Sequence, residues 1–115
     1  MQIRRRADQR LFIVVDDSPP VNRHKPSVDH LFDSVVEACG KQCIGVILTG
    51  MGADGAKGLL KLRKAGARTI AQDEKTSAVF GMPREAIRIE AAQEVLPITG
   101  IAPRLLEWLN RRKAA

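Results

Sequence analysis

Hydrophobic positions in the first third of the chain form one short run and one helical stripe. Leu11–Val15 is an apolar run that the polar and proline-rich residues 16–20 close, and this predicts a buried strand followed by a turn. Apolar residues then recur at helical spacing behind Ser27, which suits an N-cap, and Gly40 supplies the stop. The stripe consists of Val28, Leu31, Phe32, Val35 and Val36.

A second apolar run is followed directly by a turn rich in glycine. Residues 43–49 are dense in β-branched side chains, which predicts another buried strand. The turn at Gly50-Met51-Gly52-Ala53-Asp54-Gly55 leads into leucines that precede Gly66. This order of features predicts a strand, a tight turn and a helix.

The last third of the chain repeats the alternation of strands and helices. Residues 68–72 predict a third strand, Pro83 suits the first turn of a short helix, and residues 95–98 predict a fourth strand. Thr99 is then expected to cap a final helix. Its apolar stripe consists of Ile101, Leu105, Trp108 and Leu109.

Strands that alternate with helices of this length favour parallel pairing with right-handed crossovers. We therefore predict an α/β fold with three layers, helix on sheet on helix, and a mainly parallel sheet. Ligands and catalytic groups in such sheets gather beyond the carboxyl ends of the strands, which directs attention to the turn at residues 49–55.

Length and composition agree with one globular domain. The chain has 115 residues with 44% hydrophobic and 28% charged side chains, and no apolar run reaches the roughly 18 residues of a membrane helix. We expect a cytoplasmic protein without membrane insertion.

The net charge of +6 belongs to the ends of the chain. Residues 1–10 hold four arginines against one aspartate, residues 104–115 hold four basic residues against one glutamate, and residues 11–103 are neutral. We therefore divide the chain into a basic arm at 1–10 and a folded portion at 11–115. A basic face with stacking aromatic residues is missing, so we expect no nucleic-acid partner.

The cysteines and histidines give no pattern typical of a metal site. Cys39 and Cys43 are too few for a disulfide framework and lack a second ligand pair at a suitable spacing, so we expect no metal. His24 and His30 are interpreted as surface or hydrogen-bonded structural residues.

Three hypotheses address the chemistry of the chain, and the first concerns the glycine turn. Its G-x-G-x-x-G pattern, with Asp73 and Glu74 about 20 residues further on, is typical of a dinucleotide site. However, Asp54 places a carboxylate where the pyrophosphate would lie, so we expect no cofactor. A second hypothesis takes Asp16 and Asp17 as the acidic pair of a phosphorylatable receiver, but the strand that ends at Thr49 supplies no aspartate acceptor.

The third hypothesis starts from Asp54 itself. An aspartate just ahead of a helix is commonly its N-cap. With glycines on both sides, we expect the carboxylate and the amides near Met51 to be open at the edge of the sheet. A carboxylate placed there could orient a histidine and stabilise the imidazolium that forms during catalysis.

Four segments together carry a resemblance to a known family: residues 19–29, 47–55, 71–74 and 80–86. In order and in spacing, they resemble the C-terminal part of the catalytic domain of the chemotaxis-receptor methylesterases of the CheB type. The resemblance extends from about Leu11 to Leu109.

This resemblance implies an enzyme that hydrolyses glutamate methyl esters on the cytoplasmic helices of chemoreceptors and deamidates certain glutamines there. It further implies a Ser-His-Asp triad, with Asp54 at the aspartate position and the backbone amide of Met51 as an oxyanion-hole donor. The family's Gly-x-Ser-Thr-Gly-Gly turn and its histidine segment have no counterpart in these 115 residues.

We therefore expect the polypeptide alone to be inactive, and to self-associate through strand edges that the rest of a domain would cover. A module that binds the receptor or a partner without catalysis stays open as an alternative.

Overall fold

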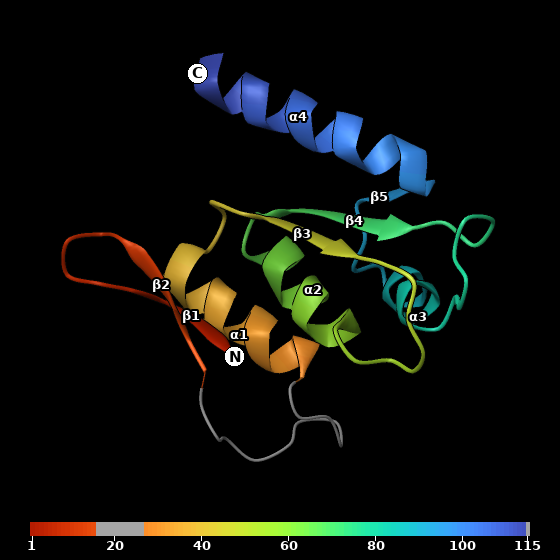
Figure 1. Ribbon diagram of the computed structural model, residues 1–115, viewed down its shortest axis with the longest axis horizontal. Helices are drawn as coiled ribbons and strands as arrows, with labels where there is room; N and C mark the ends of the chain where they lie inside the picture. The colour runs from red at the N-terminus through yellow and green to blue at the C-terminus, as the bar shows by residue number, and fades with distance from the viewer. Residues whose placement is uncertain (16–26, 115) are drawn as a thin grey trace.

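The computed structural model describes residues 1–15 and 27–114 (Figure 1). Asp16, Asp17 and His24 lie outside the described residues. In chain order the elements are β1 (Gln2–Arg5), β2 (Leu11–Val14), α1 (Val28–Cys39), β3 (Ile44–Ile47), α2 (Ala56–Lys64), β4 (Arg68–Gln72), α3 (Met82–Arg88), β5 (Glu94–Leu96) and α4 (Ile98–Ala114).

The centre of the fold is a parallel sheet in the order β3-β4-β5. Helices α2 and α3 lie on one face of this sheet and α4 lies on the other, while α1 packs beside α2 (Figure 1). This arrangement confirms the predicted α/β architecture with helices on both faces of a parallel sheet.

Alternation along the strands divides the core between the two faces. Ile47 and Ala71 point into the cluster built with α2 and α3, where Leu59 and Leu62 are fully buried. Ile70 points the other way, into the cluster with Ile101 and Trp108 of α4. The period of two that defines a strand is therefore what supplies both faces of the sheet with apolar contacts.

The N-terminal strands depart from the prediction. The run Leu11–Val15 was predicted to be a buried strand, yet β2 pairs antiparallel with β1 in a separate hairpin, and Leu11 and Ile13 are 50% and 62% exposed. The hairpin packs on α1 through β1, where the Ile3 N–H donates to Ser34 Oγ at 2.9 Å. Residues of β2 alternate between exposed and half-buried, so one face of the hairpin is covered better than the other.

Strand β1 lies within the segment that was assigned to the basic arm. The division of the chain into residues 1–10 and 11–115 stays a prediction.

The start of the last helix also differs. Thr99 was expected to be the N-cap, but α4 begins at Ile98, and the Ile98 N–H donates to Thr76 Oγ1 at 3.0 Å. A threonine from a distant loop therefore serves this helix end. In the predicted stripe, Ile101 and Trp108 are buried, whereas Leu109 is about half exposed.

No helix among the described residues is long and apolar enough to cross a membrane.

Candidate functional site

The glycine turn lies beyond the carboxyl end of β3 and is fixed by a neighbouring segment. Gly50 forms an isolated parallel bridge with Phe80, and the Gly50 N–H donates to Val79 O at 2.9 Å. The carbonyl oxygen of Gly50 accepts from the N–H groups of Gly81 and Met82, at 3.0 and 2.9 Å. Both polar groups of the Gly50 backbone are therefore held by residues 79–82.

A buried glutamine holds the start of the same turn. Gln72, at the end of β4, is only 2% exposed. Its Oε1 accepts from the Thr49 N–H at 2.8 Å, and its Nε2 donates to the Thr76 carbonyl oxygen at 2.9 Å. Thr49 Oγ1 in turn accepts from the Val79 N–H at 2.8 Å. The amide of Gln72 thus links the end of β3 to the loop that follows β4.

Met51 lies at the outer tip of the turn. Its side chain is 81% exposed, and its backbone N–H donates no hydrogen bond within the described part of the chain. Gly52 follows with a φ of 88°, and the space beside its Cα is open. An amide in this setting can donate to an oxyanion, which is the role that the resemblance implies; that role stays a prediction.

Asp54 does not have the open carboxylate that was expected. The residue is 6% exposed, and its Oδ1 accepts from Ser27 Oγ at 2.9 Å and from the Asp29 N–H at 3.1 Å. Its Oδ2 accepts from the Val28 N–H at 2.7 Å. The cause is the approach of the first turn of α1, whose unpaired amides need acceptors.

These contacts also correct the expectation that Asp54 caps the helix that follows it. The N-cap position of α2 is Gly55, with a φ of 98° that glycine adopts readily, and it makes no side-chain cap. Asp54 instead serves the N-terminus of α1, a helix that begins 26 residues earlier.

Asp29 forms the reciprocal contact. From the first turn of α1, its Oδ1 accepts from the Gly58 N–H in the first turn of α2, at 2.7 Å. Each aspartate therefore accepts from backbone N–H groups at the start of the other helix, and both aspartates are buried. Three hydrogen-bond donors and the positive end of α1 favour the ionised form of Asp54.

A cavity of about 240 Å³ adjoins this pair. Its lining includes Asp29, Asp54 and Lys57, together with Glu85 and Arg88 of α3. The hydrogen bond from Arg88 lowers the pKa of the Glu85 carboxyl below its ordinary value. The cavity therefore brings charged groups from α1, α2 and α3 next to the candidate aspartate.

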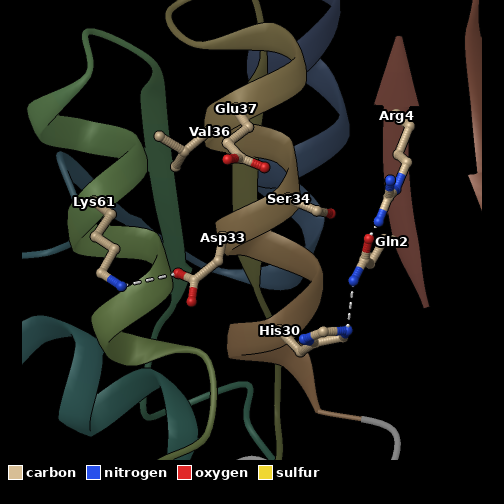
Figure 2. Close-up of a pocket in the computed structure, with 8 residues that line it drawn as sticks. All are labelled: Gln2, Arg4, His30, Asp33, Ser34, Val36, Glu37 and Lys61. Atoms are coloured by element: carbon tan, nitrogen blue, oxygen red, sulfur yellow. Dashed lines mark hydrogen bonds and ion pairs between the residues drawn. The ribbon is translucent and has the colours of Figure 1, made fainter. Parts of the chain in front are cut away.

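A larger cavity of about 400 Å³ lies along α1 and does not include Asp54 (Figure 2). In Figure 2, Lys61 points to Asp33 on one side of this helix and Gln2 points to His30 on the other. Lys61 Nζ donates to Asp33 Oδ1 at 3.1 Å, and Gln2 Nε2 lies 3.0 Å from His30 Nε2. His30 is therefore hydrogen-bonded, as the sequence indicated, and its structural role stays a prediction.

Neither Cys39 nor Cys43 forms a disulfide. Within residues 1–15 and 27–114, no group of three or more His, Cys, Asp or Glu side chains could hold a metal ion.

Sequence reasoning identified Asp54 and Met51 but missed the partners of Asp54. Ser27 was found as the N-cap of α1, which the structure confirms, since Ser27 Oγ accepts from the His30 N–H. Nothing in the local pattern indicated that the same hydroxyl donates to a carboxylate 27 residues away.

Comparison with known proteins gives one consistent family. The family model described as CheB methylesterase matches residues 1–105. A protein-glutamate methylesterase/protein-glutamine glutaminase of Bordetella parapertussis is 57% identical over 107 residues, which is 93% of this chain and 31% of that protein. A relative with the same description from Anaeromyxobacter dehalogenans, numbered 5, is 58% identical over 102 residues, covering 89% of this chain and 28% of its own length.

Among solved structures, the CheB methylesterase catalytic domain of Thermotoga maritima is similar to this chain with a TM-score of 0.86 and 38% sequence identity. The similarity covers 93% of this chain and 57% of that domain. The chain therefore spans about a third of the length of these curated relatives and a little over half of the solved catalytic domain.

Proposed function

The chain belongs to the CheB methylesterase family, and from this membership we propose that it forms the C-terminal part of a catalytic domain that hydrolyses glutamate methyl esters and deamidates glutamines on chemotaxis receptors. In this proposal Asp54 is the aspartate of a Ser-His-Asp triad and Met51 supplies an oxyanion-hole amide. The serine and the histidine come from a part of the domain that has no counterpart among these 115 residues.

One observation carries the proposal. The Asp54 carboxylate accepts from three donors of the described residues beyond the carboxyl end of β3, three residues after the exposed residue Met51. A triad needs its aspartate ionised and fixed in direction, because it sets the tautomer of the histidine and stabilises the imidazolium. The oxyanion hole needs a donor that does not have to reorganise when charge develops, and residues 79–82 hold the turn of Met51 in place.

The test is a hybrid catalytic domain. The part of the Thermotoga maritima domain that matches this chain is replaced by the chain itself, so that the remaining part supplies the serine and the histidine. Methanol release is measured on methylated cytoplasmic fragments of a receptor. We expect turnover, and Asp54→Asn is expected to lower kcat on the order of 10⁴-fold, as loss of a triad aspartate does.

Asp33→Asn is the matched control. Asp33 also lies on the α1–α2 side of the molecule and pairs with Lys61, but its side chain is exposed and far from the turn in sequence. The control hybrid should keep its kcat. A folded hybrid without turnover, or one in which the two variants behave alike, would contradict the proposal.

A module that binds a receptor without catalysis is the second candidate. It is favoured by the same contacts, because an aspartate that caps α1 has a sufficient structural role without any reaction. A folded hybrid that binds receptor fragments and releases no methanol would support this candidate instead.

A further inference from the structure

We propose that Ser27 is a positioning residue for the reaction, acting through Asp54. This inference rests on the proposed function and adds a residue to it. The hydroxyl of Ser27 would set the direction of the Asp54 carboxylate, beyond the role of Ser27 as the N-cap of α1.

The hydrogen bonds of Ser27 define where its proton points. Ser27 is buried, and its Oγ accepts from the His30 N–H at 3.4 Å and lies 2.9 Å from Asp54 Oδ1. An ionised carboxylate only accepts, so the hydroxyl proton must point to Asp54. The single hydroxyl therefore caps α1 with its lone pair and holds Asp54 with its proton.

The Ser27 donor differs in kind from the two backbone donors of α1. The N–H groups of Val28 and Asp29 belong to the backbone of α1 and move with the helix, whereas the Ser27 hydroxyl approaches Asp54 Oδ1 from the N-cap. Oδ1 thus receives two donors from different positions of the chain, and Oδ2 receives the Val28 amide. Removal of the hydroxyl takes one of these donors from Oδ1 and gives the carboxylate more freedom to rotate about its χ2 torsion.

Helices α1 and α2 pack closely next to the contact between Ser27 and Asp54. Asp29 of α1 accepts from the Gly58 N–H of α2, and a Cβ at Gly58 would lie 2.7 Å from Phe32 Cβ, so the two helices approach as closely as glycine allows. Asp54 is joined to α2 by Gly55, where a Cβ would lie 2.8 Å from Val28 Cγ1. Because the helices cannot shift without steric cost, a change at Ser27 acts on the carboxylate and not on the packing around it.

Two substitutions separate positioning from capping in the hybrid domain. Ser27→Ala removes both the cap and the donor to Asp54. Ser27→Gly removes the same hydroxyl, but glycine serves well at an N-cap, so α1 keeps its start. We expect both variants to lose about 10- to 100-fold in kcat, the equivalent of one charge-assisted hydrogen bond, with KM unchanged. Ser27→Thr keeps the hydroxyl and is expected to restore most of kcat.

Ser34→Ala is the matched control. Ser34 is a buried serine within α1, and its Oγ donates to Leu31 O at 2.6 Å and accepts from the Ile3 N–H at 2.9 Å. Its loss should lower the melting temperature and leave kcat unchanged, because neither partner belongs to the site.

The possible outcomes distinguish this inference from the function on which it rests. An active hybrid in which Ser27→Gly keeps kcat, or in which Ser34→Ala loses as much as Ser27→Ala, overturns the positioning role and leaves the proposed function standing. A folded hybrid without turnover overturns the proposed function itself. Amide exchange in the 115-residue chain adds a readout that does not depend on activity: Ser27→Gly should leave the Val28 and Asp29 amides protected, since Asp54 still accepts from them.

Discussion

A substitution at Gly81 can displace the turn that carries Met51 without changing any residue of that turn. A Cβ added at Gly81 would lie 2.9 Å from Gly50 O, 2.9 Å from Gly52 N and 3.1 Å from Gly52 O. All three are backbone atoms, so no side chain can rotate away. Gly81 itself has φ −81° and ψ −62°, which alanine adopts without strain, so the destabilising effect of Gly81→Ala comes from this contact.

The size of the effect follows from these distances. Ordinary van der Waals contact begins at 3.4 Å, so residues 50–52 must move by about 0.5 Å to accept the methyl group. That is roughly the tolerance within which a catalytic group must be held. We expect a loss of about 1–3 kcal/mol in the free energy of unfolding from overpacking. In the hybrid domain we expect kcat to fall about 100-fold, close to the effect of losing one oxyanion-hole donor.

The assay is methanol release by the hybrid domain together with thermal unfolding of the same protein. Gly100→Ala is the control, because the nearest atoms to a Cβ at Gly100 belong to Pro97 at 3.5 Å. This position lies in α4, where alanine is preferred to glycine, so the melting temperature should stay equal or rise slightly. If Gly81→Ala keeps both kcat and melting temperature, the turn does not need the close approach of residue 81 and our reasoning about Met51 is refuted.

The remaining predictions concern the chain by itself. The purified 115-residue polypeptide should release no methanol from methylated receptor fragments above the level of its Asp54→Ala variant; turnover that depends on Asp54 would mean that a nucleophile was missed. Calorimetry with NAD or FAD should give no binding at the glycine turn, and micromolar binding that strengthens in Asp54→Asn would favour the dinucleotide hypothesis. The Arg88→Met substitution should raise the pKa of Glu85 in an NMR titration, because the hydrogen bond from Arg88 lowers that pKa in the folded chain. The small stabilisation by this exposed pair therefore exists above the unfolded pKa of Glu85 and is lost as the pH falls through the folded pKa. Sedimentation velocity should show self-association, because the outer edge of β3 pairs with no strand among the described residues; a compact monomer at all concentrations would contradict this.

Local signals predicted most of the helices and the parallel sheet. Ser27 and Gly40 mark the ends of α1 as expected, with Gly40 at a φ of 55°, and the strand predicted over residues 68–72 matches β4. These features depend on residues close in sequence, where caps and alternation act directly. The same reasoning held for the short helix opened near Pro83.

The hairpin could not be predicted in this way. An apolar run such as Leu11–Val14 reads as a buried strand, and β1 carries adjacent arginines with Ile3 as its single large aliphatic residue. Its place depends on α1, where Arg5 Nε donates to Ala38 O at 2.9 Å and Ser34 accepts from Ile3. Contacts between residues that are about 30 positions apart produce no periodic pattern in the sequence.

The prediction that Thr99 caps α4 was wrong for a related reason. Thr99 has the right residue type and position for a cap, but the donor at Ile98 is satisfied by Thr76. Thr76 is itself held by Asp73 and Gln72 in the loop after β4. A cap supplied through space removes the need for one supplied by the adjacent residue, and sequence rules consider only the latter.

Asp54 shows why the structural and the catalytic interpretations of one residue need not compete. As a cap of α1 it receives donors that favour a charged carboxylate and restrict its rotation, and a triad needs these two properties in its aspartate. An aspartate held only by its histidine would have to be ordered in each catalytic cycle, at a cost in conformational entropy. Here the entropic cost is met during folding, when Asp54 accepts from the start of α1 and Asp29 accepts from the start of α2. Sequence rules assign Asp54 to the start of α2, but it accepts from the start of α1. These hydrogen bonds fix the direction of its carboxylate, and the proposed chemistry uses that direction.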